Sequence, residues 1–292
     1  MKFNLTLIDP AGYKYAYLAT DLCRAITYGL RSLGHDCNMS VNNFDLSAIN
    51  IVAMTHLLSE ADIKSIMDAG LRYICIQTEA LFPGSGEVKV MSAFQGDQFE
   101  KKCRSFYENA VAIWEPYDSN RELLARFDLP PERLKKLSLG FHEKLMDIEH
   151  RVPEKKDIDV LFFGSVSPRR QAILQALSQH CRVTGLLDAP AAFRNDLIAR
   201  AKVNLNIHNS DQFRHLSLTR TTYLLNNRCV LVSETSDTHP ELRSLILEAD
   251  YEQLVAECER ALVRTDIKQL VQHSFEQFQQ MPMTEYLREL IP

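Results

Sequence analysis

The octapeptide GSVSPRRQ, residues 164–171, follows an apolar run and precedes an amphipathic pattern. Gly164 permits close approach of the backbone, and Ser165 or Ser167 can cap a helix or donate to a phosphate. Arg169 and Arg170 fall in the first turn of the expected helix, where cations oppose the helix dipole unless an anion is bound. Two interpretations remain open: an ordinary strand-to-helix turn with solvated arginines, or a phosphate-binding site.

A second polar cluster lies further along the chain. The run KVNLNIH predicts a buried strand, so Asn206 and His208 are expected at the same sheet edge as Gly164. Arg220 opens the helical pattern that leads into the strand CVLVSE, and its cation is expected near the start of that helix. A single histidine or arginine in such a place usually bonds a neighbouring loop. Together with the arginines of the first segment, these residues favour an anion-binding site.

Alternating strand and helix patterns supply the frame that positions these residues. Strand candidates in the first half are KFNLTLI, INIVAM, RYICIQT and AVAIW, and those in the second half are DVLFFG, CRVTGLL, KVNLNIH and CVLVSE. Near-continuous apolar strands separated by helices predict an α/β protein with parallel sheets covered on both faces. A charged linker at 140–157 divides the pattern. We therefore expect two Rossmann-like domains facing each other across a cleft, residues 1–150 and residues 151–292, the second ending in a helical tail.

The composition limits the possible partners and compartments. The chain has 292 residues and a formal net charge of −5, which predicts no nucleic-acid partner and leaves anion binding to local clusters of arginine. Its seven cysteines form no CxxC pair, which argues against a disulfide framework or a zinc site and favours a reducing cytoplasm. No apolar run approaches the length of a membrane-spanning helix, so no integral membrane segment is expected.

Three motifs in the second half carry a family resemblance. They are a strand followed by G-S-x-x-x-R-R and a helix, then IARAKVNLNIH, then R-x-x-YLL-x-N-x-x-x-L-VSE. Their order resembles the C-terminal half of GT-B glycosyltransferases, closest to the spore-maturation-protein type of sugar transferase. The resemblance covers residues 157–240 and is loose over the N-terminal half.

The resemblance implies that the second half binds a nucleotide-diphosphate sugar as co-substrate, without a metal or another cofactor. Arg170 stands at the basic position of the family motif, which implies contact with the diphosphate. The expected donor-binding residues are Gly164, Ser165, Arg169, Arg170, Asn206, Arg220, Tyr223 and Glu234. The glutamate pair of many retaining members is absent, since His215 and Tyr223 occupy the matching positions, and Glu234 is the remaining candidate for a carboxylate at the ribose.

The first half is then expected to hold an acceptor, which the sequence does not identify. Glu79 follows the strand RYICIQT, where a carboxylate can deprotonate an acceptor hydroxyl, and Asp9 after the first strand is the rival base. Gly12 and Tyr13 lie in the loop after that first strand and are expected to contact the acceptor. With His208, the two acids complete the set of candidate catalytic residues; the structural alternative for each acid is to cap its loop.

Two other functions fit the same pattern. A nucleotide-sugar epimerase also uses two facing Rossmann-like domains. The missing glutamate pair also fits a degenerate transferase that binds a nucleotide sugar without turnover. Release of the nucleotide diphosphate and product analysis distinguish these alternatives from a transferase.

Overall fold

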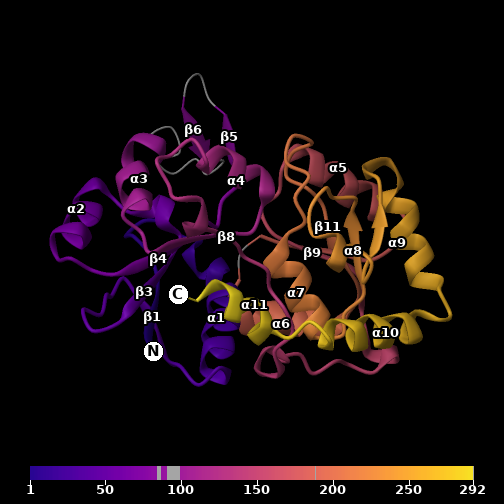
Figure 1. Ribbon diagram of the computed structural model, residues 1–292. Coiled ribbons are helices and arrows are strands. Elements are labelled where there is room, and N and C mark those ends of the chain that lie inside the picture. Colours follow the sequence, from indigo (N-terminus) through magenta and orange to yellow (C-terminus); the bar gives the residue numbers. More distant parts are fainter. Residues whose placement is uncertain (84–86, 91–98, 188, 292) are drawn as a thin grey trace. The chain divides into compact units, whose positions relative to one another are not determined.

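The computed structural model describes residues 1–83, 87–90, 99–187 and 189–291. The chain forms two compact units, one of Met1–Leu139 with Met283–Pro292 and one of Gly140–Pro282 (Figure 1). Each unit contains its own parallel sheet.

The first unit is built on a six-stranded sheet with the order β2-β1-β3-β4-β7-β8, in which every neighbouring pair is parallel. Its strands are β1 (Lys2–Leu7), β2 (Asp36–Val41), β3 (Ile49–Ala53), β4 (Tyr73–Ile76), β7 (Ala112–Glu115) and β8 (Leu134–Lys136). Its helices are α1 (Thr20–Ser32), α2 (Glu60–Asp68), α3 (Phe99–Glu108), α4 (Asp118–Leu124) and α11 (Met283–Leu290). All residues of β3, β4 and β7 are buried, as expected for central strands covered on both faces.

Shorter elements complete the first unit. They are an antiparallel hairpin of β5 (Leu81–Pro83) and β6 (Val88–Val90), and the 3-10 turns Ala16–Ala19, Thr55–Leu57 and Pro131–Arg133. The turn at Thr55–Leu57 follows β3 after the single residue Met54, so it lies at the carboxyl edge of the sheet.

The second unit is built on a five-stranded parallel sheet with the order β10-β9-β11-β12-β13. Its strands are β9 (Ile158–Phe163), β10 (Val183–Leu186), β11 (Ala201–Asn206), β12 (Leu231–Glu234) and β13 (Leu247–Ala249). Its helices are α5 (Pro168–Leu177), α6 (Ala191–Arg200), α7 (Leu218–Asn226), α8 (Pro240–Arg243), α9 (Leu254–Val263) and α10 (Ile267–Gln279), and its 3-10 turns are Glu143–Leu145, Pro153–Lys155 and Tyr251–Gln253.

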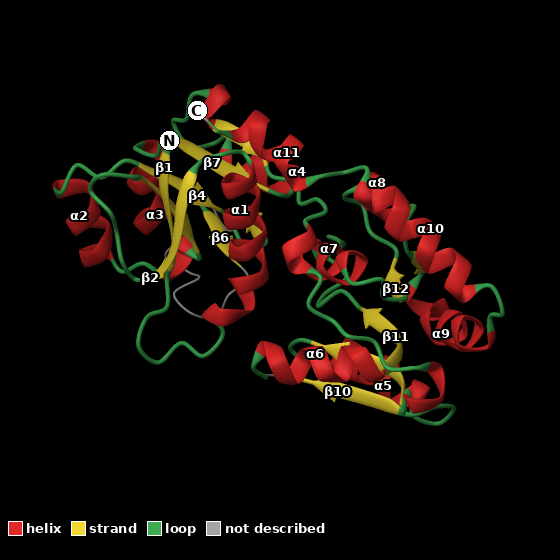
Figure 2. Ribbon diagram, turned by 90° about the horizontal axis from the view of Figure 1, so that it is seen from below, coloured by secondary structure: helices red, strands yellow, loops and turns green. Residues whose placement is uncertain are grey.

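Alternate residues of the strands enter two separate hydrophobic clusters of the second unit. Phe162 packs with Leu177 of α5 and Leu254 of α9, whereas the adjacent Leu161 packs with Ile198 of α6 and Leu224 of α7. Successive side chains of a strand point to opposite faces, so helices cover both faces of this sheet (Figure 2). The predicted α/β class with parallel sheets is confirmed.

The division into units differs from the predicted boundary at residue 150. The segment that begins at Gly140 belongs to the second unit, where the side-chain oxygens of Asn226 and Asn227 accept hydrogen bonds from the backbone of His142 and Ile148 at 3.0 and 2.9 Å. The segment at 142–148 is thereby held by the last residue of α7 and by its C-cap residue.

The C-terminal helix also differs from the predicted division. The tail is helical as predicted, but α11 belongs to the first unit, where it packs against α1. Gly29 of α1 leaves the space: a Cβ there would lie 2.5 Å from Leu287 Cδ1 and 2.9 Å from Met283 Cγ. Sequence patterns show the amphipathic face of such a helix but not the surface that it covers.

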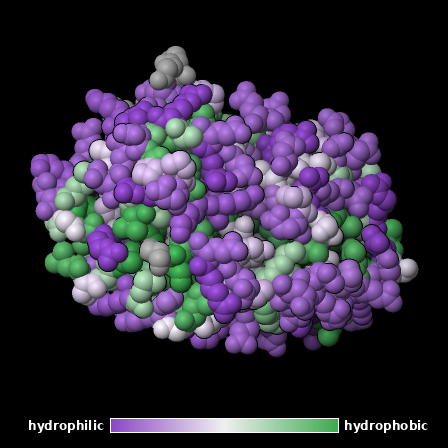
Figure 3. Space-filling view, in the orientation of Figure 1, coloured by the Kyte–Doolittle hydropathy of each residue, from purple (hydrophilic) through white to green (hydrophobic). Residues whose placement is uncertain are grey.

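The surface side chains visible in Figure 3 are mostly hydrophilic, and hydrophobic ones form smaller groups among them. None of the helices in the described part of the chain combines the length and the apolar composition of a membrane-spanning segment. All seven cysteines are free thiols.

Candidate functional site

The carboxyl edge of the sheet in the second unit gathers the polar residues singled out in the sequence. β9 ends at Phe163, directly before Gly164, and β11 ends at Asn206, two residues before His208. β12 ends at Glu234. Because the three strands are parallel neighbours, these positions meet at one edge, which is where open α/β sheets bind their ligands.

Gly164 is required by the close approach of Arg220. Its φ of +142° lies in a region that side chains with a Cβ rarely adopt, and a Cβ here would lie 2.8 Å from Nη2 of Arg220. The same Nη2 donates to the carbonyl oxygen of Phe163 at 2.6 Å. The glycine therefore lets a guanidinium pack directly onto the turn between β9 and α5.

Asn206 orients Arg220 from the neighbouring strand. Its Oδ1 accepts a hydrogen bond from Nη1 of Arg220, and its Nδ2 donates to Ser233 Oγ of β12 at 2.9 Å. The side chain is only 2% exposed. Asn206 thus links the first turn of α7 to the strand ends.

The N-terminus of α5 lies at the same edge. The helix begins at Pro168, and Ser167 is its N-cap: Oγ accepts from the backbone N–H of Arg170 at 3.4 Å and donates to the carbonyl of Asn209 at 3.2 Å. Sequence patterns left Ser165 and Ser167 as alternative caps, and Ser167 is the one that caps. The free backbone N–H groups and the helix dipole make this terminus attractive to an anion.

Arg170 is a buried cation with neutral partners. Its Nε donates to the carbonyl of Ile207 at 2.9 Å, and its Nη1 donates to the carbonyl and Oγ of Ser165 at 2.8 and 3.0 Å. Burial, followed by the charge of Arg169, lowers the pKa of Arg170 to about 10, so it remains charged at neutral pH. Among the described residues, no carboxylate forms an ion pair with this guanidinium.

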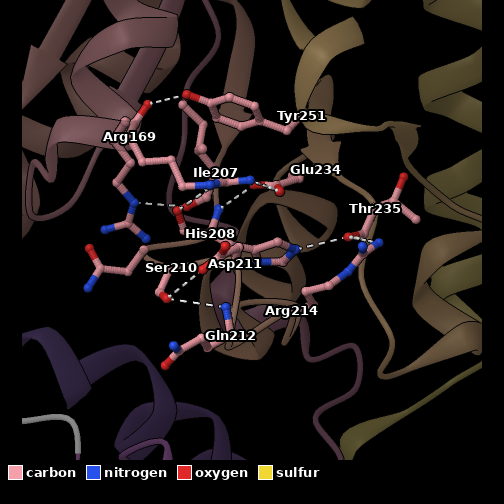
Figure 4. A network of polar contacts seen from close by, with 12 residues as sticks. Arg169, Ile207, His208, Ser210, Asp211, Gln212, Arg214, Glu234, Thr235 and Tyr251 are labelled. Atoms are coloured by element: carbon pink, nitrogen blue, oxygen red, sulfur yellow. Dashed lines mark hydrogen bonds and ion pairs between the residues drawn. The ribbon is translucent and has the colours of Figure 1, made fainter.

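Arg169 has a different environment, although it is the adjacent residue (Figure 4). Its guanidinium forms a bidentate ion pair with Glu234, with Nη1 donating to Oε2 at 2.6 Å, and lies 3.8 Å from the ring centroid of Tyr251. The hydroxyl of Tyr251 donates to the carbonyl of Arg169 at 2.8 Å. Glu234 therefore compensates the charge of Arg169 and fixes its position.

His208 is held by the end of β12. Its backbone N–H donates to Oε2 of Glu234 at 2.9 Å, and its Nε2 is 3.0 Å from the carbonyl oxygen of Thr235 (Figure 4). A carbonyl only accepts, so Nε2 carries the hydrogen. Burial lowers the pKa of His208, which favours the neutral imidazole. This candidate catalytic residue thus belongs to the network of Arg169 and Glu234.

Tyr223 lies among other neighbours. Its hydroxyl is 3.1 Å from Oδ2 of Asp147 and 3.0 Å from Oδ1 of Asn195, and the guanidinium of Arg194 lies 4.6 Å from its ring centroid. The side chain is 3% exposed and belongs to the hydrophobic cluster beneath α6 and α7. A role for Tyr223 at a nucleoside stays a prediction.

The first unit presents its own candidates at the carboxyl edge of its sheet. Asp9 follows β1 and is exposed, and its backbone exchanges hydrogen bonds of 2.8 and 2.6 Å with the side chain of Asn42. Gly12 has φ +88° and open space around it, and the ring of Tyr13 packs edge-on against Tyr15 at 5.9 Å. The loop that was predicted to contact an acceptor therefore lies beside Asp9.

Glu79 lies at the same edge, after β4. Its side chain is 25% exposed, and burial raises its pKa to about 7. The side-chain amides of Gln77 and Asn120 donate to its backbone carbonyl at 3.2 and 2.9 Å. Nε2 of His56 lies 3.7 Å from its Oε1. His56 was not singled out from the sequence, because its only signal is a polar side chain inside the apolar run that follows β3.

Known proteins resemble this chain in structure only. No protein-family model matches it, and neither does any curated protein sequence. Among solved structures, Anabaena HepE in complex with UDP-glucose matches with a TM-score of 0.60 and 10% identity, over 99% of this chain and 98% of that chain. Sucrose-phosphate synthase from Thermosynechococcus elongatus matches with a TM-score of 0.60 and 11% identity, over 99% of this chain and 98% of the synthase. T4 phage BGT in complex with its UDP-glucose substrate matches with a TM-score of 0.57 and 10% identity, over 99% of this chain and 97% of BGT.

These three structures are GT-B glycosyltransferases. The chain has the GT-B fold. At this level of identity the likeness establishes the fold, and the function has to be argued from the residues of the site.

Proposed function

We propose that this protein is a glycosyltransferase that takes its sugar from a nucleotide-diphosphate donor, within or near the spore-maturation-protein type. The observation that carries the proposal is Arg170, a buried cation at a helix N-terminus whose hydrogen-bond partners are all neutral. Glu234, whose charge also acts on Arg170, is already paired with Arg169. Burying a charge without a counter-ion is costly. A bound diphosphate supplies that counter-ion, and the helix N-terminus adds backbone donors.

In this proposal the cations at the edge stabilise the departing diphosphate. Arg170 contacts it directly with the N-terminus of α5, while Arg220 approaches it across Gly164. Arg169 is already paired with Glu234, so it contributes less charge and instead holds Glu234 in place, where this carboxylate is our candidate for the ribose. Fixed positive charge aimed at the leaving group lowers the barrier for its departure without a metal ion.

The donor nucleotide that we propose is UDP-based. The solved structures of HepE and T4 phage BGT, which have the same fold, contain UDP-glucose. In both comparisons the match extends over nearly the whole length of the two chains. The sugar and the acceptor are left to experiment.

The first unit supplies the acceptor side of the proposed reaction. Glu79 is our candidate base, because its pKa of about 7 is suited to taking a proton from a hydroxyl at neutral pH. Asp9 is exposed and has no comparable burial, so it ranks second. Gly12 and Tyr13 are proposed to contact the acceptor, and His208 is kept as a catalytic candidate on the donor side.

A thermal-shift screen over nucleoside diphosphates, followed by donor turnover, tests the proposal. A ligand that binds only the native state at a hundred times its Kd stabilises by about 2.7 kcal/mol, so UDP should raise the melting temperature clearly. Incubation with UDP-sugars should then release UDP and give a glycosylated acceptor. No shift with any nucleoside diphosphate would refute the proposal, whereas an altered sugar that remains linked to UDP would instead indicate an epimerase.

A further inference from the structure

His56 is buried at the carboxyl edge of the first unit's sheet, in the turn that follows β3. The side chain is 1% exposed, and among the described residues neither ring nitrogen has a hydrogen-bond partner. Most buried polar side chains are hydrogen-bonded, so an imidazole without a partner calls for a specific explanation. Oε1 of Glu79 lies 3.7 Å from its Nε2.

A buried network holds the loops that carry these two side chains. Thr55 Oγ1 lies 2.6 Å from the hydroxyl of Tyr107, which donates to Oε1 of Gln77 at 2.9 Å. Gln77 in turn donates from Nε2 to the backbone carbonyl of Glu79 at 3.2 Å. Thr55 precedes His56, so the network links, through Tyr107, the two loops that carry the imidazole and the carboxylate.

The charge states suit a hydrogen bond from imidazole to carboxylate. Burial, and then the charge of Lys102, whose Nζ donates to the carbonyl of His56 at 2.7 Å, lower the pKa of His56 to about 3. The ring is therefore neutral and carries one N–H. Glu79 is half ionised near pH 7. Burial raises the pKa values of Tyr107 and Glu115 well above their usual ranges, so both are neutral there.

We propose that His56 is a positioning residue for Glu79, and that the two side chains together deprotonate a hydroxyl group of the acceptor. This inference rests on the proposed function. Closing the gap of 3.7 Å to a normal hydrogen-bond length requires a shift of about 0.5 to 1 Å in the position of the partly exposed Glu79 carboxylate.

In the proposed step, Nε2–H of His56 donates to Oε1 of Glu79, and Oε2 takes the proton of the acceptor hydroxyl. The acceptor O–H bond breaks as a Glu79 O–H bond forms. The acceptor oxygen bonds to the anomeric carbon of the sugar, and the electron pair of the bond between sugar and diphosphate leaves with the diphosphate.

The hydrogen bond is tested by measuring the pKa of Glu79 in the full-length protein, using 13C NMR of labelled glutamate carboxyls with Glu79→Gln for assignment. Burial alone raises this pKa to about 7, so a hydrogen bond from His56 should hold the wild-type value about one to two units lower. His56→Leu removes the donor and should raise the pKa of Glu79 by about one to two units. His56→Gln keeps an N–H donor and should bring the pKa of Glu79 most of the way back to the wild-type value. His35→Leu, at the opposite edge of the same sheet, is the matched control and should change nothing.

Turnover of a UDP-sugar measured against pH separates positioning from a structural role. If the pKa of Glu79 rises by one to two units to about 7 in His56→Leu, its ionised fraction falls about ten- to fiftyfold at pH 5 but only about twofold at pH 7. His56→Leu should therefore slow turnover by about these factors and recover it at alkaline pH. A loss of the same size at every pH would indicate a structural role and overturn the proposal.

An unchanged Glu79 pKa in His56→Leu would also overturn it, as would a wild-type Glu79 that titrates at its ordinary value. Affinity for UDP in His56→Leu, measured by calorimetry, should equal that of the wild type. If the wild type fails to bind UDP, the proposed function fails, but the NMR titration still decides whether His56 donates to Glu79.

Discussion

Replacing Arg170 by alanine tests the diphosphate site most sharply. The side chain is 9% exposed, so its truncation removes a buried guanidinium rather than a solvated one. A hydrogen bond to a charged group contributes about 1.5 to 3 kcal/mol, which corresponds to a loss of about ten- to a hundredfold in affinity for UDP. Uridine lacks the diphosphate, and we expect its affinity to change by less than about twofold.

The same substitution also has a structural cost, which has to be measured separately. Arg170→Ala leaves the carbonyl oxygens of Ile207 and Ser165 without their donors, at about 1 to 3 kcal/mol of folding free energy. Urea unfolding of the apo protein measures this cost. Arg170→Lys keeps the charge but cannot bridge both loops, so its loss of UDP affinity should be smaller than that of alanine.

Calorimetric titration of wild type, Arg170→Ala and Arg170→Lys with UDP and with uridine gives the comparison. Arg182→Ala is the matched control, because Arg182 is an exposed arginine of the same unit, paired with Asp159 at the amino end of β9. It should leave both affinities unchanged. Equal losses of UDP and uridine affinity in Arg170→Ala would mean that the side chain only supports the loops, and an unchanged UDP affinity would remove it from the site.

Three further predictions address local packing and charge. Gly164→Ala should destabilise the protein and weaken UDP binding, whereas Gly70→Ala, also at positive φ but with open space, should show only the conformational cost of about 1 kcal/mol in urea unfolding. Burial raises the folded pKa of Glu79 from the usual 4.5 to at most about 7, so its contribution to stability is present below pH 4.5 and is lost as the pH rises toward 7. Glu79→Gln should therefore stabilise the fold at pH 8 by up to about 3 kcal/mol relative to its effect at pH 4, measured by urea unfolding at the two pH values. Gly29→Ala should lower the free energy of unfolding by about 1 to 3 kcal/mol in urea unfolding, because the added methyl group overpacks against α11. Leu287→Ala should offset much of this loss in the double variant, and additive losses would show that the two helices do not pack as described.

Much of the donor edge could be predicted because it depends on local chain chemistry. The apolar strand, Gly164 and the serines and proline that follow specify a strand, a turn and a capped helix start, and the structure has them in that order. The same holds for Arg170, whose place in the first turn follows from the start of the helix at Pro168.

Tertiary partners could not be predicted in this way. The ion pair of Arg169 with Glu234 and its stacking on Tyr251 join residues far apart in the sequence, and no periodicity selects among the many carboxylates and aromatic rings. His56 was missed because it stands within an apolar run. Strands β2, β8 and β13 were missed because they are short or largely exposed and lack an apolar pattern.

The central claim is that the carboxyl edge of the second unit binds the diphosphate of a nucleotide sugar. A crystal structure of the full-length protein with UDP tests it most directly. We predict the diphosphate at the N-terminus of α5, with at least one phosphate oxygen within hydrogen-bond distance of Arg170 or of the backbone N–H groups of residues 165–167, 169 and 170. UDP bound elsewhere, or no UDP at saturating concentration, would contradict it.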